Sequence, residues 1–194
     1  RFRAAPIERR RTSFSAKLTQ ANISPQESEP GPGRALSMGQ IADLYEYFQD
    51  FIVDRDMHYV ANNLIKPLTR DCKKSYAELI GPKTVEWFVS HYWGQEFREF
   101  TSSLRKHAEH EGQGRAGGWR DVNFWVCSLS NNQWNLDADV GFDDPLESSF
   151  YKALTSPHCK GTAMVIDQNA WPLTRSWCLF EVFQTCKLTR RRTD

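Results

Sequence analysis

Apolar residues in the first half of the chain recur every three or four positions, as they do on one face of an α-helix. Polar residues fill the other positions, and Ser37 precedes the pattern where a helix N-cap is expected. The pattern predicts a helix over 37–60. A second helical stretch is expected over 59–65, ended by Lys66-Pro67. The apolar stripe of the first helix consists of Ile41, Leu44, Tyr45, Phe48, Phe51 and Ile52.

From residue 84 onward, short apolar runs alternate with helical segments. Three runs predict strands at 85–90, 122–128 and 162–166. Alternation of strands and helices with right-handed crossovers predicts an α/β fold, a parallel sheet with helices on both faces. Strand 85–90 is apolar on both faces apart from Glu86, so it is expected at the centre of the sheet.

Three helices are expected between and after these strands. The first covers about 96–109, and the second opens at Asp144-Pro145, with Asp as N-cap and Pro at the first helical position. For the third, over 177–188, a helical wheel places Glu181 nearly opposite the apolar arc. That arc, expected to face the core, consists of Leu179, Phe180, Val182, Phe183 and Cys186.

These patterns divide the chain into three parts. Residues 1–36 are rich in Arg, Ser, Pro and Gln and predict a disordered or loosely attached tail. Residues 37–80 form a helical extension, and 81–194 form the α/β domain, which we expect to be truncated at its C-terminus. The apolar stripe of helix 37–60 has two interpretations: it packs on the following domain, or it binds a helix of a partner protein.

Composition narrows the classes of partner. The formal net charge is +1, so no overall attraction to nucleic acid or an anionic membrane is expected, and no apolar run is long enough to cross a bilayer.

The five cysteines are scattered without a CxxC pair, which argues against a disulfide framework or a zinc site and favours an intracellular, reducing compartment such as the cytoplasm. The histidines show no metal-binding spacing, and no phosphate-binding glycine motif follows a strand, so neither a metal nor a resident cofactor is expected.

Polar and aromatic residues follow each predicted strand, where the carboxyl ends of a parallel sheet form a ligand crevice. Each also has a plainer interpretation, since Trp and His near strand ends often cap a core and Asn or Gln often make turns. Glu181 is the candidate catalytic group: either it is an ordinary solvated residue, or it lies in a cleft where burial against Trp177 raises its pKa. The candidate binding residues are Ser90, His91, Trp93, Asn132, Trp134, Trp177 and Cys178.

Four segments within roughly 84–188 resemble a TIR (Toll/interleukin-1 receptor) domain: WFVSHYWG, SSFYKALTS, GTAMVID and SWCLFEVF. With its SHxWG, NNQW, SSFY and SWCLFE landmarks, the chain also resembles TIR-like proteins of dinoflagellates and related protists. The resemblance implies a flavodoxin-like sheet. It matches Glu181 to the catalytic Glu of TIR enzymes that cleave the nicotinamide–ribose bond of NAD, Trp177 and Cys178 to the WC pair before that Glu, and 90–93 to a ligand-binding loop.

The chain departs from that family in two respects: its sequence ends before the usual fourth and fifth strands, and the segment after the second strand is longer. Two functions therefore stay open. The first is an NAD glycohydrolase that uses Glu181 and takes NAD as substrate. The second is a non-enzymatic interaction or signalling module that self-associates through TIR-like surfaces, with helix 37–60 as a further surface for a protein partner.

Overall fold

Strand β2 (Trp87–His91) is the centre of the sheet in the computed structural model, which describes residues 6–140 and 144–193. β2 pairs in parallel with β3 (Asn123–Val126) on one side and with β4 (Gly161–Val165) on the other. This arrangement confirms the predicted parallel sheet and the central position of the first of the three strands. A short strand that the sequence did not indicate, β1 (Leu36–Ser37), adds to the free side of β3 in the antiparallel direction.

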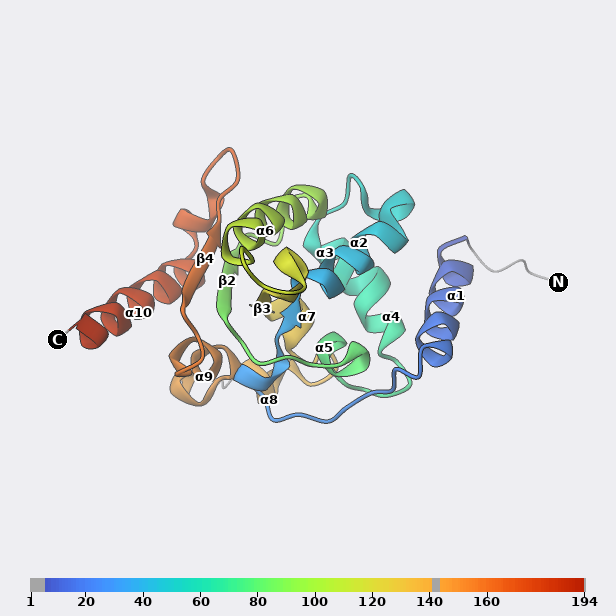
Figure 1. Ribbon diagram of the computed structural model, residues 1–194, viewed down its shortest axis with the longest axis horizontal. Coiled ribbons are helices and arrows are strands. Elements are labelled where there is room, and N and C mark those ends of the chain that lie inside the picture. Colours follow the sequence, from blue (N-terminus) through green and yellow to red (C-terminus); the bar gives the residue numbers. More distant parts are fainter. Residues whose placement is uncertain (1–5, 141–143, 194) are drawn as a thin grey trace.

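Successive side chains of the central strands enter two different cores, as the two-residue period of a strand requires. Val89, Phe124 and Val126 belong to the core beneath α2 (Met38–Ile52) and α6 (Phe97–Glu111). Phe88 and Trp125 point the other way, where their rings stack at a centroid distance of 5.1 Å and contact α9 (Ser149–Thr155). The sheet is therefore covered by helices on both faces, and the chain has the predicted α/β fold (Figure 1).

The remaining helices are short, apart from those at the two ends of the described chain, which lie at opposite ends of the molecule (Figure 1). A π-helical turn, Ala61–Ile65, joins two of the short ones. No helix of the described residues is long and apolar enough to cross a membrane. The remaining helices are α1 (Pro6–Gln20), α3 (Met57–Val60), α4 (Lys66–Leu68), α5 (Tyr76–Ile80), α7 (Cys127–Ser130), α8 (Leu136–Val140) and α10 (Ser176–Thr193).

Helix α2 begins as the sequence predicts but ends earlier. Ser37 is the N-cap and forms a capping box with Gln40. The prediction of one helix over 37–60 is wrong, because the chain turns after Ile52 and a new helix begins behind Asp56, whose Oδ1 accepts from the Tyr59 amide at 2.8 Å. The following stretch also does not end at Pro67, which lies in the first turn of α4 where a proline needs no amide donor.

The apolar stripe of α2 is part of the main core. Ile41, Leu44, Phe48 and Ile52 are fully buried and share one cluster with side chains of α6, β2 and β3. The stripe therefore packs on the α/β domain. These four side chains are not accessible to a partner protein, whereas Tyr45 and Phe51, the other two members of the stripe, are half-buried.

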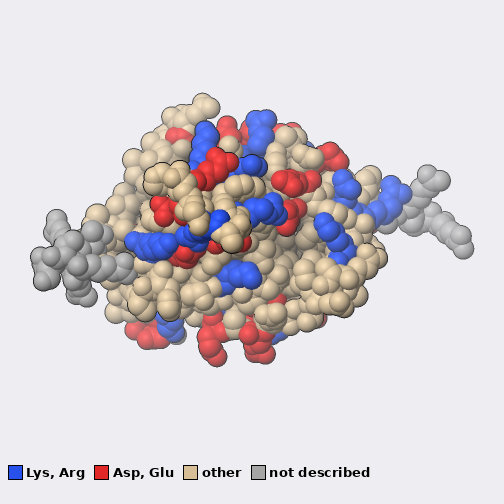
Figure 2. Space-filling model, in the orientation of Figure 1, with Lys and Arg blue, Asp and Glu red and all other residues tan. Residues whose placement is uncertain are grey.

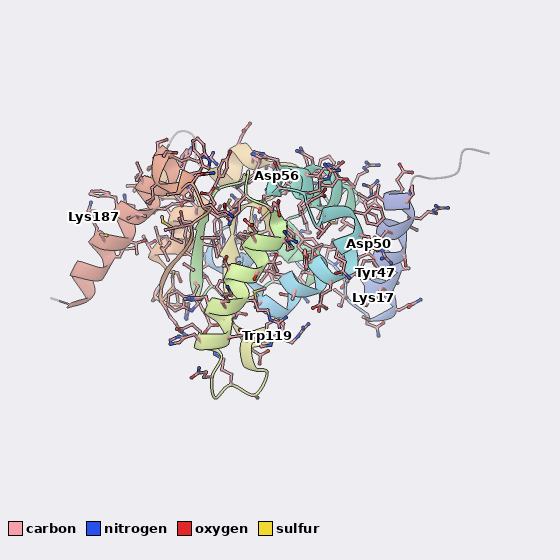
Figure 3. The ribbon with its side chains drawn as sticks, turned by 90° about the horizontal axis from the view of Figure 1, so that it is seen from above. Lys17, Tyr47, Asp50, Asp56, Trp119 and Lys187 are labelled. Atoms are coloured by element: carbon pink, nitrogen blue, oxygen red, sulfur yellow. The ribbon has the colours of Figure 1, made fainter. Side chains whose placement is uncertain are left out.

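Helix α1 occupies part of the segment for which the sequence predicts a disordered or loosely attached tail. Phe14 is its single buried side chain and packs against Tyr47 and Phe48 of α2, with ring centroids 5.0 and 5.3 Å away. Figure 3 shows Lys17, Tyr47 and Asp50 gathered where the two helices meet; Arg10 bonds Asp50 at 3.1 Å. The prediction of disorder is wrong for this stretch: Ile7 and Leu18 also pack against the core, but three apolar residues among many charged and polar ones give only a weak helical pattern.

Two element boundaries in the second half also differ from the prediction. Strand β3 ends at Val126, and Cys127 already begins the single turn of α7. Helix α9 is capped by Ser148, whose hydroxyl accepts from the Tyr151 amide, whereas Asp144 caps only a preceding 3₁₀ turn. Serine and aspartate are both good N-caps, so composition alone did not distinguish the two starts.

We expect Phe48→Ala to lower the free energy of unfolding by about 3–5 kcal/mol, the usual cost of removing a fully buried Phe. Because Phe48 belongs to the core shared with the sheet, denaturant titration followed by tryptophan fluorescence should show one shifted transition. Gln49→Ala, one position along on the exposed face, is the control and should change stability by about 0.5 kcal/mol or less. An unshifted transition of the tryptophans would mean that α2 and the sheet do not share a core.

Candidate functional site

A cleft of about 340 Å³ lies at the carboxyl edge of the three parallel strands. Its walls come from the segments that follow β2, β3 and β4. The chain leaves β2 toward β3 on one side and later returns to β4 on the other, so the crossover helices diverge at this edge and leave a crevice. The cleft is lined by His91, Trp93, Cys127, Asn131, Gln133, Leu136, Phe150, Arg175, Trp177, Cys178 and Glu181.

Glu181 places its carboxyl group inside the cleft from the second turn of α10. Burial raises the pKa of this group to about 7, and the nearby Ser90 hydroxyl and Arg175 charge offset only part of that rise. Glu181 Oε2 is buried without a hydrogen-bond partner of normal geometry among the described residues, and so is the Ser90 hydroxyl. The Ser90 hydroxyl faces the Glu181 carboxyl group, and because buried polar atoms are nearly always well paired, the poor geometry of this contact leaves hydrogen-bonding capacity for a ligand or water at the cleft.

Aromatic side chains form one wall of the cleft. Phe150 meets Trp177 edge to face at 5.5 Å, and Trp177 keeps 49% of its surface exposed. Trp93 also lines the cleft, and its indole N–H donates to Cys127 Sγ at 3.2 Å. Exposed indole faces beside a carboxyl group suit a flat ligand that carries positive charge.

The other titratable groups of the cleft are neutral near pH 7. Burial raises the pKa of the Cys127 thiol to about 12 and also raises that of Cys178. Neither thiol is therefore activated as a nucleophile. Burial, helped by the Arg175 charge, lowers the pKa of His91 to about 3, and the His91 ring packs on Phe100 of α6. Glu181 is thus the cleft residue whose charge changes near neutral pH.

The structure brings together most of the residues that the sequence selects. His91, Trp93, Trp177, Cys178 and Glu181 line the cleft, and Ser90 lies beside the Glu181 carboxyl group. Cys178 is held by a contact from its thiol to the His91 carbonyl at 3.7 Å, which ties the start of α10 to the end of β2.

Asn132 and Trp134 are not brought to the cleft. The side-chain amide of Asn132 donates to the Lys73 carbonyl at 2.8 Å, and the Trp134 indole N–H donates to Thr69 Oγ1 at 3.0 Å. Their neighbours Asn131 and Gln133 line the cleft instead. The sequence placed this whole loop at the correct edge, but the choice within the loop was shifted by one position, because the turn at 132–135 directs neighbouring side chains to different sides.

The inward face of α10 also differs from the prediction. Cys178 is buried and Glu181 reaches the cleft, whereas Leu179 and Phe183 of the expected core arc are 48% and 57% exposed. The helix lies beside β4, the last strand of the sheet, and so has little core to cover. The predicted arc is therefore correct only in part: Phe180 packs against the core cluster on that side of the sheet, whereas Leu179, Phe183 and Cys186 are exposed.

Three further lining residues have no signal in the sequence that distinguishes them. Cys127 is the last apolar residue of a strand-like run, Leu136 lies in a polar stretch, and Phe150 belongs to an apolar row that indicates only a core. Arg175, one residue before α10, is the single cation among the lining residues.

A buried ion pair fixes the wall that contains Asn131, Gln133 and Leu136. Arg34 donates to Asp139 at 3.0 Å, and Asp139 in turn accepts from the backbone N–H of Asn132 at 2.6 Å. Glu78 lies on the other side of Arg34 at 3.5 Å. The wall is thus attached to the segment before β1, far away in the sequence.

No group of His, Cys, Asp or Glu among the described residues is arranged to hold a metal ion. Comparison of the chain with protein-family models, with curated proteins and with solved structures finds no match.

We expect Glu181→Gln to stabilise the protein above pH 7 but not at pH 4. The folded pKa of about 7 exceeds the ordinary value of 4.5, so between these values the folded state binds more protons, and its stability falls as pH rises. Gln does not titrate, so the variant should gain at most about 3 kcal/mol at pH 8. Unfolding measured for both proteins at each pH cancels the contribution of His91. An equal difference at pH 4 and pH 8 would show that Glu181 is not buried as a neutral acid.

Proposed function

We propose that the protein is a TIR-like NAD glycohydrolase in which Glu181 is the catalytic carboxylate. The observation that carries this proposal is a buried carboxyl group with an unpartnered oxygen, placed in an aromatic-walled cleft at the carboxyl edge of a parallel sheet. Its place on the helix after the third parallel strand agrees with the TIR resemblance. The strand order β3-β2-β4 agrees with the first three strands of a flavodoxin-like sheet.

Cleavage of the nicotinamide–ribose bond suits this set of groups. The bond breaks with its electron pair going to the ring nitrogen, so the leaving group departs as neutral nicotinamide and needs no proton from the protein. Positive charge develops on the ribose, and the Glu181 carboxylate, in a site with little water, would stabilise it. Water then attacks the ribose carbon and loses a proton, which a carboxylate with a pKa of about 7 can accept.

The aromatic residues would hold the substrate. The exposed indole of Trp177, buttressed by Phe150, offers a face for the positively charged nicotinamide ring. Ser90, His91, Trp93 and Cys178 would shape the base of the site, with NAD as substrate rather than resident cofactor. None of the five cysteines, all of which lie among the described residues, forms a disulfide, which favours a reducing, intracellular compartment such as the cytoplasm.

A non-enzymatic interaction module is the second candidate, because large apolar side chains are exposed along 166–183. A cluster of this kind often marks a protein–protein surface, and self-association would use it. Elsewhere, basic and acidic side chains are interspersed on the face shown in Figure 2, as the small net charge implies. The exposed apolar residues of this segment are Ile166, Trp171, Leu173, Trp177, Leu179 and Phe183.

We expect the purified protein to release nicotinamide from NAD, and Glu181→Gln to lower the rate by ~10²–10⁴-fold, as loss of a catalytic acid or base usually does. Chromatographic detection of nicotinamide at several protein concentrations covers the case in which activity requires assembly. Glu46→Gln, on the exposed face of α2, is the matched control and should keep full activity. Equal rates for the two variants would remove Glu181 from the mechanism, and no release at any concentration would favour the interaction module.

The pH profile should identify the active form of Glu181. Because the ionised carboxylate stabilises the ribosyl cation, kcat/KM should fall tenfold per pH unit below about pH 7 and be constant above it. The groups that face Glu181 are the neutral His91, the protonated thiols of Cys127 and Cys178, and the permanently charged Arg175, so none of them titrates in this range. A rate that instead falls above pH 7 would assign the reaction to the protonated acid.

A further inference from the structure

Arg175 has no partner that accounts for its charge. It lines the cleft from the residue before α10, yet its guanidinium forms no ion pair or hydrogen bond with a side chain of the described residues. The guanidinium lies over the ring of Tyr92, 5.5 Å from the centroid, and is near enough to His91 and Glu181 to lower the pKa of both. An arginine held over an aromatic ring keeps its N–H groups free to bind an anion.

The surroundings of Arg175 favour negative charge in a ligand. It is the single cation among the residues that line the cleft, and His91 beside it is neutral at pH 7. The first turn of α10 carries no acidic residue, so the partial positive charge of that helix end is not neutralised locally. Tyr92 is itself held against Trp171 at 6.2 Å, which supports the platform beneath the guanidinium.

The size of the cleft limits how much of a ligand it can enclose. Its volume of about 340 Å³ lies at the lower end of the range for small-molecule sites. A base and its ribose fill a space of that order, whereas the second nucleotide of a dinucleotide would extend past the opening. A phosphate attached to the enclosed ribose would then lie at the boundary between cleft and solvent.

We propose that Arg175, supported by Tyr92, is a phosphate subsite that makes the cleft selective for nucleotides over nucleosides. The subsite would bind the phosphate on the 5′ oxygen of the ribose whose base lies against Trp177. A mononucleotide therefore contains all that the cleft recognises, and the adenosine half of NAD is dispensable. This proposal rests on the proposed function for the identity of the base, but not for the binding of the phosphate.

A plainer role for Arg175 would be to adjust the charge of Glu181, whose pKa it lowers. The two roles differ in what they recognise. An effect through Glu181 acts on every ligand alike, whereas a phosphate subsite distinguishes two ligands that differ only in a phosphate. Nicotinamide mononucleotide and nicotinamide riboside are such a pair.

The test measures the dissociation constants of both ligands by calorimetry on the full chain carrying Glu181→Gln, so that neither ligand is consumed. Adding Arg175→Gln should weaken nicotinamide mononucleotide binding by about tenfold to a hundredfold, the worth of a charge-assisted hydrogen bond, and change riboside binding less than twofold. Arg175→Lys should recover part of the loss, because it restores the charge without the planar fork. Arg98→Gln, an exposed arginine of α6 outside the cleft lining, is the control and should change neither constant.

Equal weakening of both ligands, or no weakening of the mononucleotide, would overturn the phosphate subsite. Arg175→Lys also keeps the test decisive if Arg175→Gln fails to fold, because a lysine that binds the mononucleotide no better than the riboside would refute the proposal. Failure of the proposed function has a different result: the unsubstituted protein would release no nicotinamide, while binding of the mononucleotide still depended on Arg175.

Discussion

The structure depends on the burial of β2 from all sides but one. Parallel strands hydrogen-bond to its backbone on both edges, and Phe88 and Val89 enter separate cores above and below the sheet. A strand enclosed in this way can present side chains to a ligand only where it ends. Ser90 and His91 are its last two residues and are almost fully buried, so their polar atoms must find partners at the base of the cleft. The position of the site is thus a consequence of strand order, before any side chain of the cleft is considered.

The central part of the fold could be predicted from the sequence, because strong periodicity comes from large buried faces. The three parallel strands, the start of α2 at Ser37 and the extent of α6 all follow from such patterns. Elements held by few buried contacts could not be predicted. Helix α1 is attached through Phe14 and the half-buried Ile7 and Leu18, and β1 has only two residues, so neither leaves a strong period in the sequence. The break after Ile52 depends on a turn within a stretch whose pattern continues as a helix.

For the candidate site, the sequence predicted which segments meet but not which side chains of each segment point inward. In the loop after β3, Asn131 and Gln133 face the cleft while Asn132 and Trp134 bond to the α4 side, a difference of one position that composition cannot resolve. Helix α10 shows the same limit in another form. Part of its apolar arc, Leu179 and Phe183, lies outward because the helix packs at the edge strand of the sheet, while Phe180 packs on the core and Glu181 enters the cleft. Arg175 could not be identified as a binding residue from the sequence either, because an arginine in a loop is usually solvated and only the structure shows that this one lines the cleft.

The two candidate functions make different demands on α10, and the helix meets them on different faces. A protein that only binds other proteins gains nothing from Glu181, whose carboxyl group is buried beside the Ser90 hydroxyl and costs stability whenever it is ionised. Perturbed and incompletely satisfied groups of this kind persist mainly where a site uses them, which favours chemistry in the cleft. The exposed Leu179 and Phe183 have no role in that chemistry and lie on the outer side of the same helix. Apart from Trp177, which belongs to both the cleft lining and the exposed apolar set, the two functions would use different residues of α10, and a partner confined to Leu179 and Phe183 would leave the Glu181 carboxyl group in the cleft.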